Sequence, residues 1–591
     1  MALTTAQLAQ QRKEAEELLF SGPQKLGFAK ALFFGHCNAH LLFPYPHIRA
    51  EEQARLKQIL ADVRRFADER IDPAAIDREA KIPQEVVSGL GQLGVLGMTA
   101  PELYGGQGIS QLGNSRVMEI IGARCAATAV FVNAHHSIGI RALLLFGTEE
   151  QKKRWLPALA SGQQLAAFAL TEREAGSDAA NVQTMATPTP DGKTFILNGE
   201  KRYITNGGIA GVLTVMARTP VPGTNHSKVT AFLVTPDMPG FEVLEARMPK
   251  CGIRGTATAR LAFHNMPVPA ENVLGQVGKG LRVALTVLDF GRTTFGASCT
   301  GVAKVCLQAA AQYASTRVQF KQPLGEFELV KKKIAFMAAN AFAMEATVSQ
   351  CAAFIDRGAE DYMLETAMLK VWSTDALWQI VNDTIQIYGG KAYFTDEPYE
   401  RMMRDARINM IGEGANDVLR AFIAMVGMKP VADVLLGVKN ALSHPFREFG
   451  TLWGFGRKQL EARVWTPHIP VQSPALRGEA HELGKRVNEF GRAVQAILMR
   501  YRESILERQY VHERIADAAC DLYAASCTLS RLDSLLAHCT VNGNGTEVNR
   551  DVAAGKYFLR LAGRRIRQNL AALHDNDDEQ TTATANAFLR E

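Results

Sequence analysis

The stretch FALTEREAGSD, residues 168–178, marks the point at which the pattern of the sequence changes. Before it, over residues 51–165, apolar residues recur at steps of three and four, which predicts amphipathic helices. After it, short β-branched and aromatic runs alternate with turns rich in glycine, asparagine and proline, as in hairpins. The stretch therefore opens a small all-β domain. We expect strands over residues 194–197, 211–216, 228–235 and 259–263.

Helical periodicity returns beyond the β region and predicts a bundle of long helices joined by short turns. Five prolines then interrupt the chain and indicate a linker, after which helical patterns resume. The expected fold is mainly α with a central β domain. Its parts are a leader segment (1–50), an N-terminal helical domain (51–165), a middle β domain (166–277), a helical bundle (278–428), a linker (429–475) and an extra C-terminal helical domain (476–591).

The composition excludes several classes of protein. Hydrophobic residues make up 47% of the 591 residues, which is typical of a globular chain rather than a disordered one. The net charge of +6 is small for this length, so a dedicated nucleic-acid binder is disfavoured. No uninterrupted apolar run is long enough to predict a spanning helix. Nine cysteines without a CxxC pair or a zinc-like spacing predict a reducing compartment and no metal site.

Three further stretches carry the chemistry. YITNG (203–207) lies in the β domain, whereas QIYGG (386–390) and IGEGAND (411–417) lie in the predicted bundle. Together with FALTEREAGSD they resemble the signature segments of acyl-CoA dehydrogenases, in the same order and at similar spacing. The resemblance covers about residues 51–428 and implies a helical domain, a β-barrel-like domain and a helical bundle. ERQYVHERIAD (507–517) resembles the extra C-terminal domain of the very-long-chain branch of that family.

The resemblance implies FAD-dependent α,β-dehydrogenation of a long- or very-long-chain fatty acyl-CoA. In this reaction a carboxylate removes the proton from Cα while a hydride leaves Cβ for the flavin. An acyl α-proton is too weak an acid for a carboxylate alone, so the developing enolate needs oriented hydrogen bonds at the thioester oxygen. Burial beside an apolar chain should also raise the pKa of the carboxylate towards the working pH.

Glu413 is the expected base, because it is the acidic residue of the IGEGAND stretch that matches the family position. The alternative reading is a helix-capping or salt-bridged glutamate between two glycines. Another branch of the family carries its base just before the arginine of a Leu-Asp-x-x-Arg segment, which ends at Arg292 here. The corresponding residue is Gly291, which cannot carry a proton, so this second position fails.

The resemblance assigns a larger set of residues to FAD. Thr171 and Thr205 would form hydrogen bonds with the flavin ring. Tyr203 would lie against the face of the ring, where the family usually has tryptophan. Taken alone, Thr205 is an ordinary strand residue before an Asn-Gly turn, and Gly389 and Gly390 suit a helix C-cap. The expected set is Phe168, Leu170, Thr171, Ser177, Tyr203, Ile204, Thr205, Arg317, Phe320, Gln386, Gly389, Gly390, Ala415, Asn416 and Asp417.

Several residues depart from the family pattern. Lys321 and Glu328 replace a glycine and a glutamine near Arg317, whose segment resembles the one that reaches FAD phosphates across a dimer. Gly412 replaces an aromatic residue and so removes bulk near the thioester. Ala415 replaces a threonine whose hydroxyl would help to hold FAD, and one lost hydrogen bond costs on the order of 1 kcal/mol.

The expected substrate contacts lie on both sides of the base. Asp289 and Arg292 would face the entrance for the pantetheine arm, although a structural ion pair explains this pair equally well. The expected set is Ser177, Asp289, Arg292, Gly412 and Gly414.

The resemblance also implies partners: a fatty acyl-CoA, electron-transferring flavoprotein and a second copy of the chain in a homodimer. Residues 550–567 hold six basic residues and one acidic residue, a local charge of +5. This charge suits contact with an anionic membrane, or equally a packed helix with a solvated basic face. The acidic residues within the first 20 match no targeting signal.

We therefore expect a cytoplasmic protein, in a bacterium at times peripheral on the inner membrane, or a protein of the mitochondrial matrix side in a eukaryote. Two other functions stay open. One is a non-catalytic assembly factor for a respiratory complex, built on the same fold. The other is an acyl-CoA oxidase, in which oxygen re-oxidises the flavin.

Overall fold

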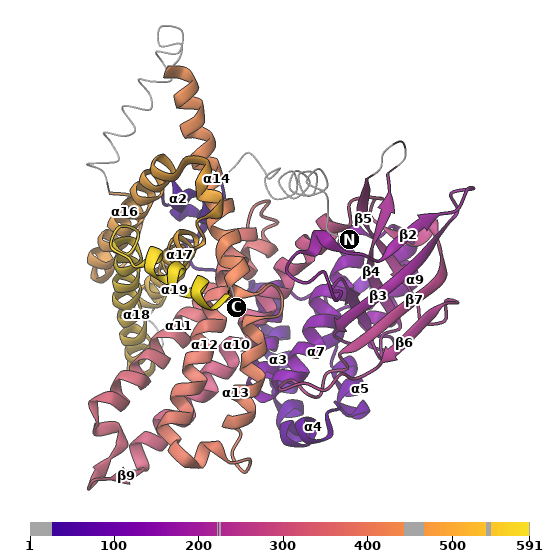
Figure 1. Ribbon diagram of the computed structural model, residues 1–591. Helices are drawn as coiled ribbons and strands as arrows, with labels where there is room; N and C mark the ends of the chain where they lie inside the picture. Colours follow the sequence, from indigo (N-terminus) through magenta and orange to yellow (C-terminus); the bar gives the residue numbers. More distant parts are fainter. Residues whose placement is uncertain (1–25, 222, 224–225, 443–465, 539–544, 590–591) are drawn as a thin grey trace.

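The computed structural model describes residues 26–221, 223, 226–442, 466–538 and 545–589. Figure 1 shows a β-sheet on one side of the molecule and the long helices of the later chain on the other, with the N-terminal helices between them. The expected fold, mainly α with a central β domain and an extra C-terminal helical domain, is confirmed.

The N-terminal helices run from α3 (Ala50–Arg70) to α9 (Glu149–Ala160). On α3, Leu56, Val63 and Ala67 recur at helical spacing and are buried, as the periodicity predicts. Between α3 and α9 lie α4 (Pro73–Glu79), α5 (Gln84–Gln92), α6 (Gln111–Arg124), α7 (Ala126–Val132), the π-helical turn η4 (Asn133–Ile140) and α8 (Arg141–Phe146).

One helical run of this block, Ala126–Phe146, is long and apolar enough to cross a membrane by length and composition alone. Of its most apolar window, 67% is buried inside the protein. Its middle turn, η4, packs against β1 (Ala166–Ala169) and α10 (Gly280–Thr316). A core helix enclosed in this way has the same apolar composition.

An eight-stranded sheet forms the middle domain, in the order β6-β7-β3-β2-β4-β5-β8, with β1 parallel to β4. The four predicted strands are confirmed as parts of β3, β4, β5 and β7. The sequence pattern misses the other four, each of which has five residues or fewer. The strands are β1, β2 (Met185–Pro188), β3 (Thr194–Ile204), β4 (Val212–Pro220), β5 (Ser227–Val234), β6 (Phe241–Glu245), β7 (Ala259–Pro269) and β8 (Val273–Leu274).

The bundle is built around α10, which packs closely on α6 of the N-terminal block. A Cβ at Gly301 of α10 would lie 2.0 Å from the main-chain oxygen of Glu119, so only glycine allows this approach. The other helices are α11 (Glu328–Asp356), α12 (Met363–Tyr388), α13 (Tyr399–Arg407) and α14 (Asn416–Leu442), and a hairpin of β9 (Val318–Gln319) and β10 (Gln322–Pro323) follows α10.

Helix α14 continues to Leu442, well into the segment that its prolines predict as a linker. Pro430 lies inside this helix and lacks the N–H that would continue the hydrogen-bond ladder. Val426 and Val431 on either side of it are buried, so packing holds the helix together across the proline. Residues 443–465 of the predicted linker lie outside the described residues.

The C-terminal domain covers the bundle with four helices: α16 (Arg477–Tyr501), α17 (Gln509–His538), α18 (Gly545–Ala571) and α19 (Asp578–Leu589). Between α14, α16 and α17 lies α2 (Phe28–Phe33), the first described helix. Its Phe28, Leu32 and Phe33 are fully buried, and the Phe33 ring lies where a Cβ at Gly427 would be. Helix α2 of the leader segment is therefore part of the core.

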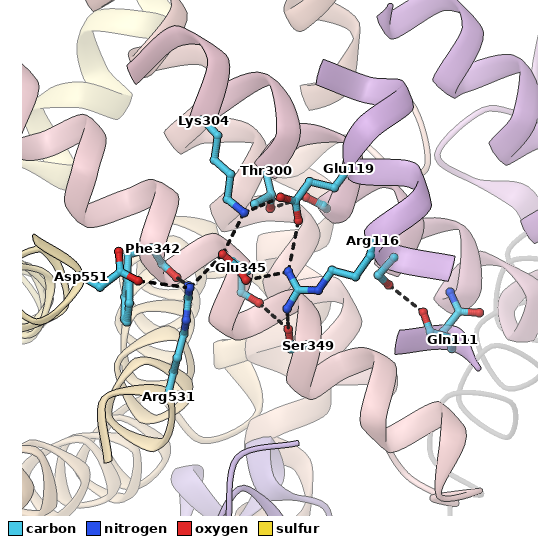
Figure 2. A network of polar contacts seen from close by, with 12 residues as sticks. Gln111, Arg116, Glu119, Thr300, Lys304, Phe342, Glu345, Ser349, Arg531 and Asp551 are labelled. Atoms are coloured by element: carbon cyan, nitrogen blue, oxygen red, sulfur yellow. Dashed lines mark hydrogen bonds and ion pairs between the residues drawn. The ribbon is translucent and has the colours of Figure 1, made fainter. Parts of the chain in front are cut away.

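A network of charges joins these domains (Figure 2). Glu345 of α11 lies at its centre and pairs with Arg116 of α6 at 2.6 Å, with Lys304 of α10 at 2.8 Å and with Arg531 of α17 at 2.9 Å. Burial alone would raise the pKa of Glu345, but these three cations hold it well below its usual range. The N-terminal, bundle and C-terminal domains thus share one ionised carboxylate.

Candidate active site

Glu413 lies on the short loop that precedes α14. Its φ is +60°, a left-handed conformation that is uncommon outside glycine, and Gly414 follows with φ +98°. The main chain of the loop reaches the surface of the chain, whereas Oε2 of Glu413 is buried and has no hydrogen-bond partner among the described residues. Such strain usually persists where the surroundings hold a functional group in place.

Two cations surround the loop. Arg292 Nε donates to the main-chain oxygen of Glu413 at 3.4 Å, and Lys370 Nζ donates to that of Gly414 at 2.6 Å. Burial raises the pKa of Glu413, and the charges of Arg292 and Lys370 act in the opposite direction. Lys370 is fully buried, and this burial lowers its own pKa to about 7.

Gly291 lies directly opposite the carboxyl group. A Cβ at this position would be 3.3 Å from Oε2 of Glu413 and 3.1 Å from Cγ1 of Ile138. The two base positions compared in the sequence therefore face the same point in space. In this chain, one of them carries the carboxylate and the other leaves room for it.

Asp289 and Arg292 are both buried and form an ion pair of 3.2 Å on one turn of α10. Thr366 Oγ1 of α12 donates to Asp289 Oδ1 at 2.8 Å. Burial raises the pKa of Asp289 to about 6, although the guanidinium beside it lowers that pKa. This geometry is the structural ion pair left open by the sequence, and a contact of either residue with the pantetheine arm stays a prediction.

The two signature stretches of the β domain are joined to each other. Arg202 N of β3 donates to the main-chain oxygen of Thr171 at 2.9 Å. One residue before it, Lys201 donates to the oxygen of Leu170 and pairs with Glu172 at 2.6 Å in a fully buried contact. Burial lowers the pKa of Lys201 to about 8. The expected flavin contacts Phe168, Leu170, Thr171, Ile204 and Thr205 are thereby brought together.

Tyr203 projects from this assembly. It has φ +61° and is 57% exposed, and the guanidinium of Arg202 lies 4.9 Å from the centre of its ring. An exposed aromatic ring near the end of β3 suits contact with a flat ring system. Ser177 is also exposed, on the loop that follows the first stretch.

The other expected FAD residues lie elsewhere in the chain. Figure 1 shows β9 at the outer tip of the bundle, on the side away from the sheet. Arg317 precedes β9, and Phe320 at the turn is 88% exposed. Gly389 and Gly390 follow the end of α12, where Tyr388 stacks on Tyr313 of the last turn of α10 with ring centres 4.1 Å apart. Gln386 is exposed on the last turn of the same helix.

The residues next to Glu413 in the sequence differ in how far their side chains are exposed. The Asn416 side chain is buried and fully used within the chain: Nδ2 donates to Thr374 Oγ1 at 3.0 Å and to Asp375 Oδ1 at 2.8 Å, and Oδ1 accepts from Lys370. Asp417 is exposed. Before the base, a Cβ added at Gly412 would have one neighbour within 4 Å, the main-chain oxygen of Ile408 at 3.7 Å. The FAD and substrate contacts predicted for this loop stay predictions.

Sequence reasoning misses three charged residues of the site: Glu172, Lys201 and Lys370. The lysines occupy otherwise apolar strand and helix faces, which is the one signal that could have revealed them. Their partners are distant in sequence, however, so the sequence alone does not say what they bind.

A cavity of about 670 Å³ lies apart from this site, between α11, α12 and the C-terminal domain. Most of its charged residues form ion pairs with one another: Arg420 contacts Asp375 at 2.6 Å and Asp517 at 2.8 Å, and Arg565 contacts Asp521 at 2.5 Å. None of the predicted site residues lines it.

Known proteins resemble each part of the chain. The N-terminal, middle and C-terminal domains of acyl-CoA dehydrogenase match residues 53–163, 167–266 and 278–428. The ACAD9/ACADV C-terminal domain matches residues 474–588.

Similarity to individual proteins extends over nearly the whole length. The mitochondrial very long-chain specific acyl-CoA dehydrogenase of Mus musculus is 36% identical over 564 residues, which is 94% of this chain and 85% of that protein. The probable acyl-CoA dehydrogenase FadE10 of Mycobacterium tuberculosis is 34% identical, over 98% of this chain and 91% of that one. An acyl-CoA dehydrogenase from Bacillus anthracis, solved in complex with FAD, superposes with a TM-score of 0.77 at 26% identity over 94% of both chains.

The resemblance drawn from the four signature stretches is thereby confirmed. Three consecutive domain matches, together with 36% identity over 94% of the chain, leave one assignment. The chain belongs to the acyl-CoA dehydrogenase family.

Proposed function

We propose that the protein oxidises a long- or very-long-chain fatty acyl-CoA to the trans-2-enoyl-CoA, the first step of fatty acid β-oxidation, with Glu413 as base and FAD as hydride acceptor. The observation that carries this proposal is the buried carboxyl oxygen of Glu413, which no described donor contacts. A buried carboxylate free of hydrogen bonds is a strong base for its type. Similarity to very-long-chain enzymes supports the substrate class.

The chain supplies what proton removal requires. Burial raises the pKa of Glu413 and so favours the neutral acid that forms when it takes the proton from Cα. The charges of Arg292 and Lys370 lower this pKa and so favour the ionised carboxylate before the reaction. The main-chain N–H of Glu413 donates to no described residue. It is therefore available to the thioester oxygen, where negative charge develops as the proton leaves.

The residues present fit FAD. When bound, FAD would accept the hydride from Cβ. Tyr203 offers an exposed aromatic face, Thr171 and Thr205 offer hydroxyls, and Arg317 offers a guanidinium fork for phosphate. At Gly389 and Gly390 no atom lies within 4 Å of an added Cβ, which leaves open space for a ligand against the main chain.

The separation of these residues supports a homodimer. Figure 1 shows β9, which Arg317 precedes, on the side of the bundle away from β3, which carries Tyr203, so a second copy would bring its hairpin to the flavin face of the first. The exposed Val318 and Phe320 give this hairpin an apolar surface. Sedimentation velocity at micromolar concentration tests the dimer.

Electron-transferring flavoprotein is the proposed electron acceptor, which would re-oxidise the reduced cofactor.

Helix α18 supports a limited form of membrane contact. Phe558, Ala562 and Ile566 face the core, whereas Arg560, Arg564 and Arg567 are exposed along the opposite side. The apolar face is used by packing, so attachment would be electrostatic and would be lost at high salt. Binding to anionic vesicles at low salt tests this contact. The proposed setting is the cytoplasm with its inner membrane, or the mitochondrial matrix.

Anaerobic titration of the purified flavoprotein with acyl-CoAs of increasing length tests the function. We expect bleaching of the flavin absorbance that is strongest with long chains. Glu413→Gln keeps the shape of the side chain and removes the base, so we expect bleaching to slow by at least about a hundredfold. Reduction of Glu413→Gln at the wild-type rate would refute the assignment of the base.

The same preparation separates the other functions. A non-catalytic assembly factor would bind no flavin or would never bleach with palmitoyl-CoA. An oxidase would release hydrogen peroxide in air without an added acceptor. For the proposed dehydrogenase we expect neither result.

A further inference from the structure

We call residues 412–416, around Glu413, the catalytic loop. Within the described part of the bundle, Lys370 is the one fully buried lysine that donates hydrogen bonds to this loop. Its ammonium lies 2.6 Å from the oxygen of Gly414 and 2.8 Å from Oδ1 of Asn416. It lies in the N-terminal half of α12, between Leu369 and Val371, which are both buried. Burial of a lysine at this position costs desolvation free energy, which its hydrogen bonds to the loop offset in part.

Hydrogen bonds are important for this loop because its side chains offer little surface for packing. Gly412 and Gly414 carry no side chains, and Ala415 contributes one methyl group. An added Cβ at Gly412 would meet only one atom within 4 Å, the oxygen of Ile408 at 3.7 Å, whereas one at Gly414 would lie 3.2 Å from the side chain of Leu419. The left-handed conformations of residues 413 and 414 are therefore held by Leu419 on one side and by hydrogen bonds to the main chain.

The hydrogen bonds come from two helices. Arg292 of α10 holds the oxygen of Glu413, and Lys370 of α12 holds the next oxygen along the chain. Asn416 completes the attachment to α12 through Thr374 and Asp375. The main-chain oxygens of the two strained residues thus each accept a hydrogen bond from a different cation.

We infer that Lys370 is the positioning residue of the catalytic loop: it fixes the peptide that follows Gly414 and, when protonated, supplies a positive charge near the carboxylate of Glu413. The inference rests on the proposed function, in which Glu413 is the base, and assigns to Lys370 no contact with substrate or cofactor. The charged and titratable groups that face the lysine are Arg292 and Cys299 of α10, Asp375 of α12 and Glu413 itself.

The test compares Lys370→Met, which removes the donor and the charge, with Lys370→Gln, which keeps an N–H donor. Lys304→Met is the matched control, because it removes a paired lysine of the Glu345 network, away from the loop. Each full-length flavoprotein is labelled with 13C at the glutamate carboxyl carbon and titrated by NMR. The Glu413→Gln protein identifies the Glu413 signal.

For both Lys370 variants we expect the Glu413 midpoint to rise by about one pH unit, since a nearby cation lowers a carboxyl pKa by that order. The ionised fraction below the midpoint then falls about tenfold, and anaerobic flavin reduction slows by a similar factor and shows the same shift in its pH profile. Lys370→Gln should reduce flavin faster than Lys370→Met because it retains a donor. Lys304→Met should keep the wild-type midpoint.

An unchanged Glu413 midpoint in a folded Lys370→Met or Lys370→Gln protein overturns the inference, and Lys370→Gln serves as the readout if the methionine variant does not fold. The NMR titration does not require turnover. If the wild-type protein fails to bleach with any acyl-CoA, the proposed function falls, and the titration still decides whether Lys370 controls the ionisation of Glu413.

Discussion

At the scale of single residues, the opposition of Gly291 and Glu413 supports the proposal that the base of this chain lies on the loop. Oε2 of Glu413 lies where the first atom of a side chain at position 291 would press against it. A carboxylate carried at either position would therefore reach the same point, so one arrangement of the surrounding site suits both. The choice between them is steric as well as chemical.

Gly291→Ala tests this opposition. Its Cβ would lie 3.1 Å from Ile138 and 3.3 Å from the Glu413 carboxylate, so one of the two must move by a few tenths of an ångström. We expect flavin reduction to slow by about tenfold, because small displacements of a reacting group are costly. Stopped-flow absorbance measures the rate. Gly437→Ala, in α14 with no neighbour within 4 Å of its Cβ, should leave the rate unchanged.

At the scale of elements, α2 is fixed to α12 by two carboxylates. Glu365 Oε1 accepts from the main-chain N–H of Ala29 at 2.7 Å, and Asp361 accepts from Gly27 and pairs with Lys30. Burial, reinforced by the charge of Asp361, raises the pKa of Glu365 to about 8. The attachment of α2 therefore depends on a carboxyl group that is neutral at physiological pH.

Glu365→Gln should make the stability of the protein less dependent on pH. A folded-state pKa above the ordinary value near 4.5 means that the wild-type stability is complete at low pH and falls as pH rises towards and through 8. Glutamine keeps the accepting oxygen without the charge. We expect the variant to gain about 2–4 kcal/mol over wild type between pH 5 and pH 9 in urea unfolding.

The exposed neighbour Glu360→Gln is the control and should show no such trend. A constant difference between Glu365→Gln and wild type across this pH range would contradict the role given to Glu365.

At the scale of the whole molecule, Glu345 joins three domains through one carboxylate. Glu345→Gln would leave Arg116, Lys304 and Arg531 with one fewer anion in a largely buried site, and breaking such a pair costs about 3 kcal/mol. We expect a lower unfolding midpoint above pH 5 and a smaller difference in acid, because the wild-type Glu345 loses its advantage as it becomes protonated.

Differential scanning calorimetry at several pH values measures this effect. Glu326→Gln, which breaks the exposed pair with Lys331, should cost less than about 1 kcal/mol. Equal losses from the two variants would show that the network does not hold the domains together.

Much of this architecture could be predicted from the sequence, because the signals are local. Long strands such as β3 and β7 carry enough β-branched and aromatic residues between turns to be recognised. The strands β2 and β8 could not be recognised, since runs of two to four residues have no period and form by pairing with distant partners. The burial of α2 was hidden for the same reason.

The site divides in a similar way. Glu413 could be proposed as the base because the stretch IGEGAND resembles a family segment, and the Asp289–Arg292 ion pair could be anticipated because its members lie three residues apart on one helix. The contacts of Lys370 and Lys201 could not be predicted, since each depends on which distant groups the fold brings within 3.5 Å. Long-range electrostatics is the part of the chemistry that no short stretch encodes.

The position of α2 has a consequence for synthesis of the chain. The ribosome makes Phe28, Leu32 and Phe33 before α12 and α14, and α16 and α17, which complete their enclosure, are made later still. Domains that emerge earlier fold as units while translation continues. The nascent chain consequently carries a partly covered apolar segment until α16 and α17 have been made, and a chain that stops before α16 exposes part of this segment to chaperones and to aggregation.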